Sequence, residues 1–290
     1  MKSFTRSKKR KSGRQPPRRS RSVTKHLAKK VGQPPGTLVY VGDAGEEEVR
    51  IAVMDYGLEG LKELMDAQVK DILPFRQSPT VTWVNVDGLH KTDVVKSIGE
   101  YFDIHHLVLE DVVNTTQRLK LEIHDGYLFI ALRLLQFDEE TEEVGFSQTS
   151  LIIGENFLLS FNQHEERMFD PIRERLRQGM GRLRGGGADY LAYALLDLVV
   201  DNYFVIIEKL SERIEVVEEE LVNDPQRETL SAIHALKRDM IALRRSVWPM
   251  REVINRMLRN ETPFISDSTR PYLRDVYDHT IHAYEIIESF

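Results

Sequence analysis

Cysteine is absent from the 290 residues of this chain, which excludes a disulfide framework and any thiolate metal site. The basic N-terminus is not followed by an apolar segment, so no secretory signal peptide is expected. The longest apolar stretch, residues 190–207, is interrupted by Asp197 and Asp201. Because carboxylates are costly in lipid, we expect this stretch to form a helix of a soluble protein rather than a membrane span.

Motifs of catalysis are also missing. The sequence has no Walker-type phosphate loop and no Gly-x-Ser-x-Gly nucleophile motif. Residues 179–181 (GMG) imitate a nucleotide-binding loop, but they follow a predicted helix, whereas the nucleotide motif follows a strand. His164 and Glu165 begin like a zinc-protease motif, yet Met168 stands where the second histidine is needed. We therefore predict that the chain is not an enzyme.

Charge is distributed unevenly along the chain. Residues 1–33 carry 13 Lys and Arg and no Asp or Glu, whereas residues 34–290 carry 27 Lys and Arg against 46 acidic residues, a net charge of −19. The first segment is predicted to be a disordered basic arm, because it has too few apolar residues to form a core. The acidic body attracts cations and repels nucleic acid, so no nucleic-acid partner is expected. An acidic surface is also a common means of keeping a protein soluble.

Residues 34–165 are predicted to form an α/β domain. Helical periodicity marks residues 58–69, 92–102 and 106–113. Residues 127–137 are apolar on both faces, which predicts a central strand covered on both sides. Strands mixed with helices, followed by hairpins, predict a layered α/β/α domain with a mixed, largely antiparallel sheet of about seven strands. The predicted strands are 37–41, 49–54, 81–86, 119–124, 127–137, 145–153 and 156–162.

Residues 166–262 are predicted to form a long antiparallel helical hairpin, because two helices with apolar residues at steps of three and four are separated by a short break. The apolar pattern stays in phase across Pro249, which predicts a kink there and not a break. The last segment, residues 263–290, has a narrower stripe of the same kind. It fits a helix that continues past Phe290 and contacts copies of itself, or a terminal helix docked on its own domain. The stripe consists of Leu273, Val276, Thr280, Ala283, Ile287 and Phe290.

Several side chains could bind a metal ion. Glu110 and Asp111 end a predicted apolar helix, where the helix dipole opposes anions, so a nearby cation is expected. On the last helix, Asp275 with His279 and Asp278 with His282 form i,i+4 pairs that could bind a transition metal, although a solvated helix face explains the same spacing. The adjacent residues 105–106 (HH) could also ligate a metal, or simply lie at the surface of the domain.

Seven short motifs occur in a fixed order along the chain. They are 83–88 (WVNVDG), 107–111 (LVLED), 117–122 (QRLKLE), 169–175 (FDPIRER), 190–203 (YLAYALLDLVVDNY), 247–252 (VWPMRE) and 274–279 (RDVYDH). With these motifs in this order, the chain resembles the cytoplasmic part of a CorA-type magnesium (divalent metal ion) transporter. The resemblance covers nearly everything after the basic arm, and the order of the motifs makes it specific. His106 and Leu119 stand where that family usually has proline.

This resemblance implies a homopentamer at the cytoplasmic face of the cell (inner) membrane. Residues 263–290 would then be the start of a stalk helix. The Gly-Met-Asn signature and two membrane helices of such a protein are not among the 290 residues. The basic arm would lie near anionic lipid, with nucleic-acid binding and inert disorder as alternatives.

The resemblance also implies regulatory Mg²⁺ sites between neighbouring subunits. Asp111 of one subunit and Asp275 of the next would be the main ligands, with Glu110 and Asp197 as helpers. Bound Mg²⁺ would close the pore, and its loss would open it. Two alternatives remain: a family member that transports zinc, cobalt or nickel, and a soluble helical adaptor that binds partner proteins.

Overall fold

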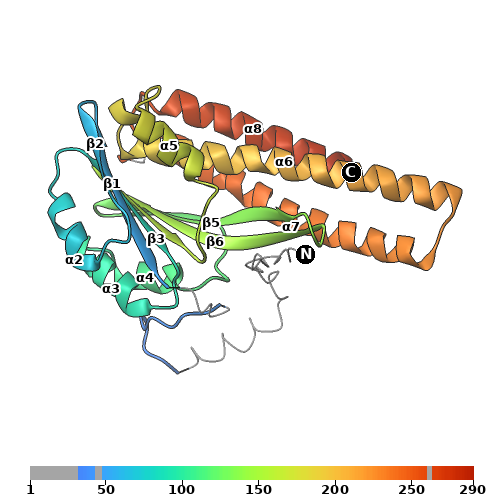
Figure 1. Ribbon diagram of the computed structural model, residues 1–290, viewed down its shortest axis with the longest axis horizontal. Coiled ribbons are helices and arrows are strands. Elements are labelled where there is room, and N and C mark those ends of the chain that lie inside the picture. The colour runs from blue at the N-terminus through green and yellow to red at the C-terminus, as the bar shows by residue number, and fades with distance from the viewer. Residues whose placement is uncertain (1–31, 43–47, 260–262) are drawn as a thin grey trace, which may run out of the picture.

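The computed structural model describes residues 32–42, 48–259 and 263–290, so the predicted basic arm lies almost entirely outside the described residues. A seven-stranded sheet organises the fold, with its strands in the order β2-β1-β3-β7-β6-β5-β4 (Figure 1). Neighbouring strands are antiparallel except β3 and β7. The strands are β1 (Arg50–Gly57), β2 (Gly60–Leu64), β3 (Val81–Asp87), β4 (Lys120–His124), β5 (Tyr127–Asp138), β6 (Glu143–Ile153) and β7 (Phe157–Asn162).

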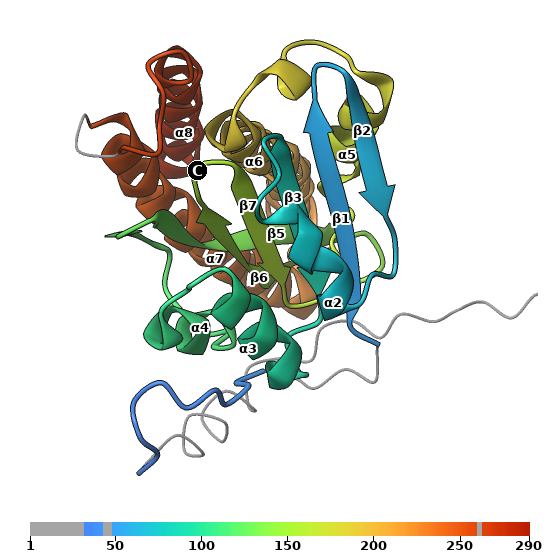
Figure 2. The same ribbon diagram turned by 90° about the vertical axis from the view of Figure 1, so that its left-hand side faces the viewer.

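Helices cover both faces of this sheet, which confirms the predicted α/β/α layering (Figure 2). One face carries α2 (Val69–Ile72), η2 (Leu73–Phe75), α3 (Thr92–Tyr101) and α4 (His106–Val112). The other face carries α5 (Asp170–Gln178), η3 (Leu183–Gly185), α6 (Ala188–Asn223), α7 (Arg227–Leu258) and α8 (Arg270–Ser289). The mixed, largely antiparallel sheet of the prediction is confirmed as well.

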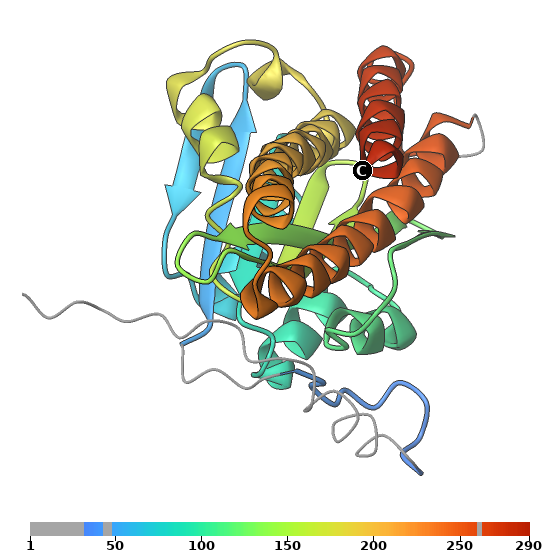
Figure 3. The same cartoon turned by 90° about the vertical axis from the view of Figure 1, so that its right-hand side faces the viewer.

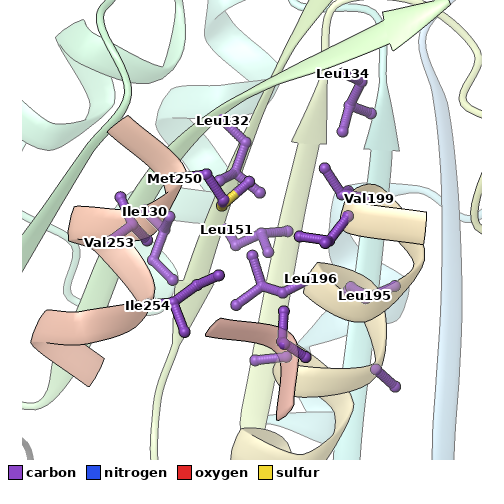
Figure 4. Close-up of a cluster of buried hydrophobic side chains, with 14 of the residues drawn as sticks. Ile130, Leu132, Leu134, Leu151, Leu195, Leu196, Val199, Met250, Val253 and Ile254 are labelled. Atoms are coloured by element: carbon purple, nitrogen blue, oxygen red, sulfur yellow. The ribbon is translucent and has the colours of Figure 1, made fainter. Parts of the chain in front are cut away.

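Two buried apolar clusters lie on the two faces of the sheet. Strand β5 contributes to both: Ile130 and Leu132 face the α6–α7 side, whereas Phe129 and Ala131 face the α3–α4 side. The strand is thus covered on both sides as predicted, but it lies next to the edge strand β4 and not at the centre of the sheet. Figure 4 shows the larger cluster, where side chains of α6, of α7 and of the sheet converge.

Two predicted elements at the start of the domain are wrong. Residues 58–69 are not one helix, because residues 60–64 form the edge strand β2, which pairs with β1 after a tight turn between Gly57 and Gly60. The leucine spacing there imitates a helix, but the open edge of β1 provides backbone hydrogen-bond partners that outweigh a local preference. Residues 37–41 do not form a strand of the sheet, since only Val41 makes an isolated bridge, to Asn114.

The predicted hairpin is present as α6 and α7, which run side by side beyond the sheet (Figures 1 and 3). Helix α7 passes through Pro249 without ending, as predicted. Arg213 of α6 and Asp239 of α7 form an ion pair of 3.0 Å whose side chains are largely buried. Near the loop that joins the two helices, the apolar residues of α6 are no longer covered by other elements, and Leu221 is 51% exposed.

Helix α8 packs along α6 and α7 of its own chain (Figure 3). Its buried residues are Leu273, Val276, Thr280, Ala283 and Ile287, which we call the α8 stripe. In the described residues the α8 stripe is thus buried against the chain's own helices, and its side chains are covered there. Among the described helices, α6 alone is long and apolar enough to cross a membrane, but 61% of its most apolar window is buried in this fold.

Candidate metal centre

The facing surfaces of α6 and α8 bring together two pairs of possible ligands. Asp197 and Asp201 are four residues apart on α6, and Asp275 and His279 are four residues apart on α8. Residues at this spacing lie on one side of a helix. Ligand atoms of Asp197, Asp201 and His279 all lie within 4.8 Å of one another, and we call these three residues the α6–α8 cluster.

The carboxylates beside His279 are not paired with a lysine or an arginine in the part of the chain that the structure describes. Within the residues that the structure describes, no Lys or Arg forms an ion pair with Asp197, Asp201 or Asp275. Burial raises the pKa of Asp197, and the charges of Asp201 and Asp275 raise that pKa further, whereas His279 opposes the rise. A cation at this position would relieve the repulsion, so the donor set fits a divalent metal ion.

Aromatic contacts hold the imidazole rings of α8. The ring of Phe204 meets His279 edge to face, with the ring centres 6.3 Å apart, and lies 5.8 Å from the ring centre of His282. Tyr193 donates a long hydrogen bond of 3.5 Å to Asp197 Oδ2. The predicted pair of Asp278 and His282 is not part of the α6–α8 cluster.

The second predicted group, Glu110 and Asp111, lies at the end of α4 and is already partnered. Lys120 Nζ donates to Asp111 Oδ2 at 2.6 Å and to Glu122 Oε1 at 2.7 Å. Burial alone would lower the pKa of Lys120, but its hydrogen bonds with these two carboxylates raise it. The predicted cation beside Asp111 is thus, in one chain, the ammonium group of Lys120.

Backbone and amide groups complete the surroundings of α4. The Gly36 N–H donates to Glu110 Oε2 at 2.8 Å, and the side-chain amide of Gln117 donates to Asp111. His105 accepts a hydrogen bond from the Leu107 N–H at 3.3 Å and so caps the start of α4. This capping gives His105 a structural role that needs no metal.

The four predicted ligands form two separate groups within one chain. Asp197 and Asp275 lie together on α6 and α8, whereas Glu110 and Asp111 lie on α4, which covers the opposite face of the sheet (Figure 2). Sequence reasoning had not identified Asp201 as a ligand. Its spacing of four residues from Asp197, on an otherwise apolar helix, is the signal that could have identified it.

Comparison with known proteins identifies the family. The family model described as "CorA-like Mg2+ transporter protein" matches residues 78–290. This chain belongs to that family. The cobalt/magnesium transport protein CorA of Thermotoga maritima is 46% identical over 266 residues, which cover 92% of this chain and 76% of that protein. A putative metal ion transporter of Bacillus subtilis is 31% identical over 215 residues, covering 73% of this chain and 66% of that protein.

A solved CorA structure supports the fold. The soluble domain of CorA from Methanocaldococcus jannaschii superposes with a TM-score of 0.67, covering 82% of this chain and 91% of that domain at 17% identity. At that identity the likeness shows the fold alone. The relatives are named as transporters and not as enzymes, in agreement with the predicted lack of catalysis.

Proposed function

We propose that this chain is the cytoplasmic, Mg²⁺-sensing part of a homopentameric divalent-cation channel, located at the cytoplasmic face of the cell (inner) membrane. The observation that carries the proposal is the unbalanced charge of Asp197, Asp201 and Asp275 where α8 meets α6. Family membership, and the cobalt and magnesium named for the Thermotoga relative, favour this function over a soluble adaptor.

The two groups of acidic residues suggest why sensing would require neighbouring copies. Asp111 lies on the α4 face of the sheet and Asp275 on the α8 face. An ion that uses both carboxylates must therefore lie between two copies of the chain. Without a cation these carboxylates repel one another across the contact, and a bound dication would neutralise them. Glu110 and Asp197 would stand beside the main ligands.

Lys120 would keep the affinity of the proposed site for Mg²⁺ low. Its ammonium group contacts Asp111, so an incoming dication has to compete with an internal positive charge. Mg²⁺ also retains several waters and uses only one or two carboxylates, which suggests a dissociation constant of roughly 10⁻⁴–10⁻³ M by analogy with weakly liganded calcium modules. Such a site would respond to free cytoplasmic Mg²⁺ because it is neither always full nor always empty.

Opening of the pore would follow from a shift in the populations of the closed and open states. Neutralised carboxylates favour the closed, symmetric arrangement of copies, and repulsion between them favours arrangements in which α8 of one copy separates from α4 of the next. The cation shifts this equilibrium only to the extent that it binds the closed state more tightly.

The test is limited proteolysis of the full-length protein titrated with Mg²⁺. We expect Mg²⁺ to protect the wild type, and we expect Asp111→Ala combined with Asp275→Ala to abolish the protection. Asp278→Ala is the matched control, because this exposed residue lies on α8 outside the α6–α8 cluster. Unchanged protection in the double variant would show that the ligand assignment is wrong.

The basic arm has a separate proposed role at the membrane. A lysine or arginine near an anionic surface contributes about 1 kcal/mol to binding, so residues 1–33 would hold this part of the protein near anionic lipid. Vesicle flotation with and without these residues, at low and high salt, tests this role. Flotation that is independent of the arm would contradict it.

A further inference from the structure

We infer that a single copy of this chain binds a phosphate group at Arg118, Arg133 and Arg245, which we call the arginine cluster. Inorganic phosphate and the phosphates of a nucleotide share the chemistry that these side chains recognise. The site involves no member of the α6–α8 cluster, and it needs neither a metal ion nor a second copy.

Three separate segments bring the arginine cluster together. Arg133 lies on β5, opposite Gln148 of β6. Its Nη2 donates a long hydrogen bond of 3.5 Å to the carbonyl oxygen of Gln117, which directly precedes Arg118 in the chain. The third arginine comes from α7, which packs against β4, β5 and β6 (Figure 3).

Arg245 reaches β5 because α7 crosses the sheet. Asp239 of α7 accepts a hydrogen bond of 3.4 Å from the Val144 N–H of β6, and Arg256 of α7 donates to the carbonyl oxygen of Leu121 on β4. Arg245 lies between these two contacts along the helix, and β5 lies between β6 and β4 in the sheet. The positive charge of Arg245 accordingly acts on the arginine of β5.

The charge of the arginine cluster is not balanced within the residues that the structure describes. None of its three side chains forms an ion pair there, although residues 34–290 carry 46 acidic residues. Burial lowers the pKa of Arg133, and the positive charges of Arg245 and Arg118 lower that pKa further. An anion bound among the three guanidinium groups would remove this repulsion.

One edge of the Arg133 guanidinium offers donors to an oxyanion. Its Nε is buried and has no hydrogen-bond partner in the described part of the chain, and the bond from Nη2 to Gln117 is at the long limit. Nε and Nη2 share the edge on which two oxygens of a phosphate or a carboxylate bind together. A buried donor without an acceptor costs free energy, so an anion that supplies the acceptor binds more tightly.

The ring of Phe146 positions this guanidinium. The Cζ of Arg133 lies 5.1 Å from the ring centre, so less side-chain freedom is lost when an anion binds. The ring is 52% exposed, and an aromatic ring beside a phosphate site can also stack a nucleotide base. A phosphate group fits three guanidinium groups better than one carboxylate does, because it offers three acceptor oxygens and a charge of about −1.5 to −2 at neutral pH.

Carboxylates of a second copy are the rival occupant, because they too would balance the arginine cluster. The two explanations differ in how the isolated chain responds to phosphate. A phosphate site fills in the monomer, whereas a contact between copies leaves the monomer indifferent to phosphate and forms only on self-association.

The experiment titrates the 290-residue chain with inorganic phosphate in a metal-free buffer at neutral pH, at an ionic strength held constant with sodium chloride. The fraction used is one that sedimentation shows to be monomeric, and binding is followed through the NMR signal of the Arg133 Nε–H and the amide signals of residues 117–118. We expect saturable binding in the wild type. The dissociation constant should rise about tenfold in Arg133→Gln and in Arg245→Gln, because each variant loses a charge-assisted hydrogen bond.

Arg238→Gln is the matched control, because Arg238 is also exposed on α7 and forms no ion pair in the described residues. Its dissociation constant for phosphate should match that of the wild type. Titration with ATP and with tripolyphosphate identifies the source of the phosphate. Tighter binding of ATP that Phe146→Leu reduces to the level of tripolyphosphate assigns a nucleotide, and equal binding of the two assigns the phosphate group alone.

Four outcomes would overturn the inference. These are spectral changes that chloride alone reproduces, a dissociation constant for phosphate that is equal in Arg133→Gln and the wild type, equal weakening in Arg238→Gln and Arg245→Gln, and self-association through the arginine cluster without phosphate binding to the monomer. Thermal unfolding of each variant excludes loss of fold as a cause. Because the titration contains no divalent cation, its result is independent of the proposed Mg²⁺ sensing.

Discussion

Replacing Lys120 with methionine should strengthen the binding of divalent cations beside α4. The ammonium group lies between the carboxylates of Asp111 and Glu122, 2.6 Å from one and 2.7 Å from the other. It therefore occupies the position that a cation bound by these two carboxylates would take. Methionine keeps the apolar stem of the lysine side chain but removes the ammonium group and its competing charge.

The magnitude follows from Coulomb's law. A Mg²⁺ ion bound to Asp111 would lie about 5 Å from the ammonium group, and at an effective dielectric constant of about 20 the repulsion would be about 6–7 kcal/mol. Lysine can swing aside, and both side chains are about a quarter exposed, so only part of this energy is felt. We expect a gain of about 1–3 kcal/mol, which corresponds to about a 5- to 150-fold lower dissociation constant.

The assay is a Mg²⁺ titration of the 290-residue chain followed through the NMR amide signals of residues 110–122. Lys91→Met is the control, because Lys91 is exposed and forms no ion pair in the described residues; its dissociation constant should match that of the wild type. Thermal unfolding of Lys120→Met checks that the fold survives the loss of the pair. An unchanged or weaker affinity in Lys120→Met would refute the view that this lysine competes with the metal.

Three further predictions concern stability. Arg213→Met leaves the buried Asp239 carboxylate without its cation and should lower the free energy of unfolding, measured by urea titration, by about 3 kcal/mol. The control Lys209→Met breaks only exposed ion pairs and should change this free energy by less than about 0.5 kcal/mol. Leu273→Ala in the α8 stripe should lower the free energy of unfolding by about 2–5 kcal/mol and should speed amide hydrogen exchange in α8 more than in the sheet. Equal exchange protection of α8 and the sheet in this variant would contradict the docking of α8. Burial above all raises the pKa of Glu166. At a pH between the ordinary pKa of a glutamate and this raised pKa, the folded state keeps a proton that the unfolded state has released. The free energy of unfolding should therefore fall as the pH rises through this range. Urea unfolding across this range should show a flatter profile for Glu166→Gln, and identical slopes in the two proteins would refute the assignment.

Periodicity in the sequence was sufficient to predict the long elements. Helices α6 and α7 repeat their apolar residues over many turns, and strand β5 carries apolar residues on both faces, so local pattern and tertiary burial agree there. The short edge strand β2 was missed because its pairing with β1 is a tertiary contact, and residues 60–64 carry the leucine spacing of a helix.

The candidate site also has a part that the sequence predicts and a part that depends on tertiary packing. Sequence spacing predicted the pair of Asp275 and His279, because both lie on one helix and a period of four residues reveals it. The contribution of Asp201 depends on how α6 packs against α8, which no local pattern records. Strand alternation places Lys120 on the same face as Glu122, which the sequence alone could show. The contact of Lys120 with Asp111 depends on how the end of α4 packs beside β4, and no local pattern records that packing.

Relative energies decide how a metal at the α6–α8 contact can act on α8. Leu273, Val276 and Ile287 of the α8 stripe are almost fully buried and together stabilise the docking of the helix by about 5–9 kcal/mol. A ligand at ten times its dissociation constant contributes only about 1.4 kcal/mol. Metal binding therefore cannot decide whether α8 is docked; it can only bias how α8 lies against α6. Protection from proteolysis by metal should accordingly concentrate at the ends of α8 and in the segment that leads into it, whereas sites along the stripe stay protected with or without metal.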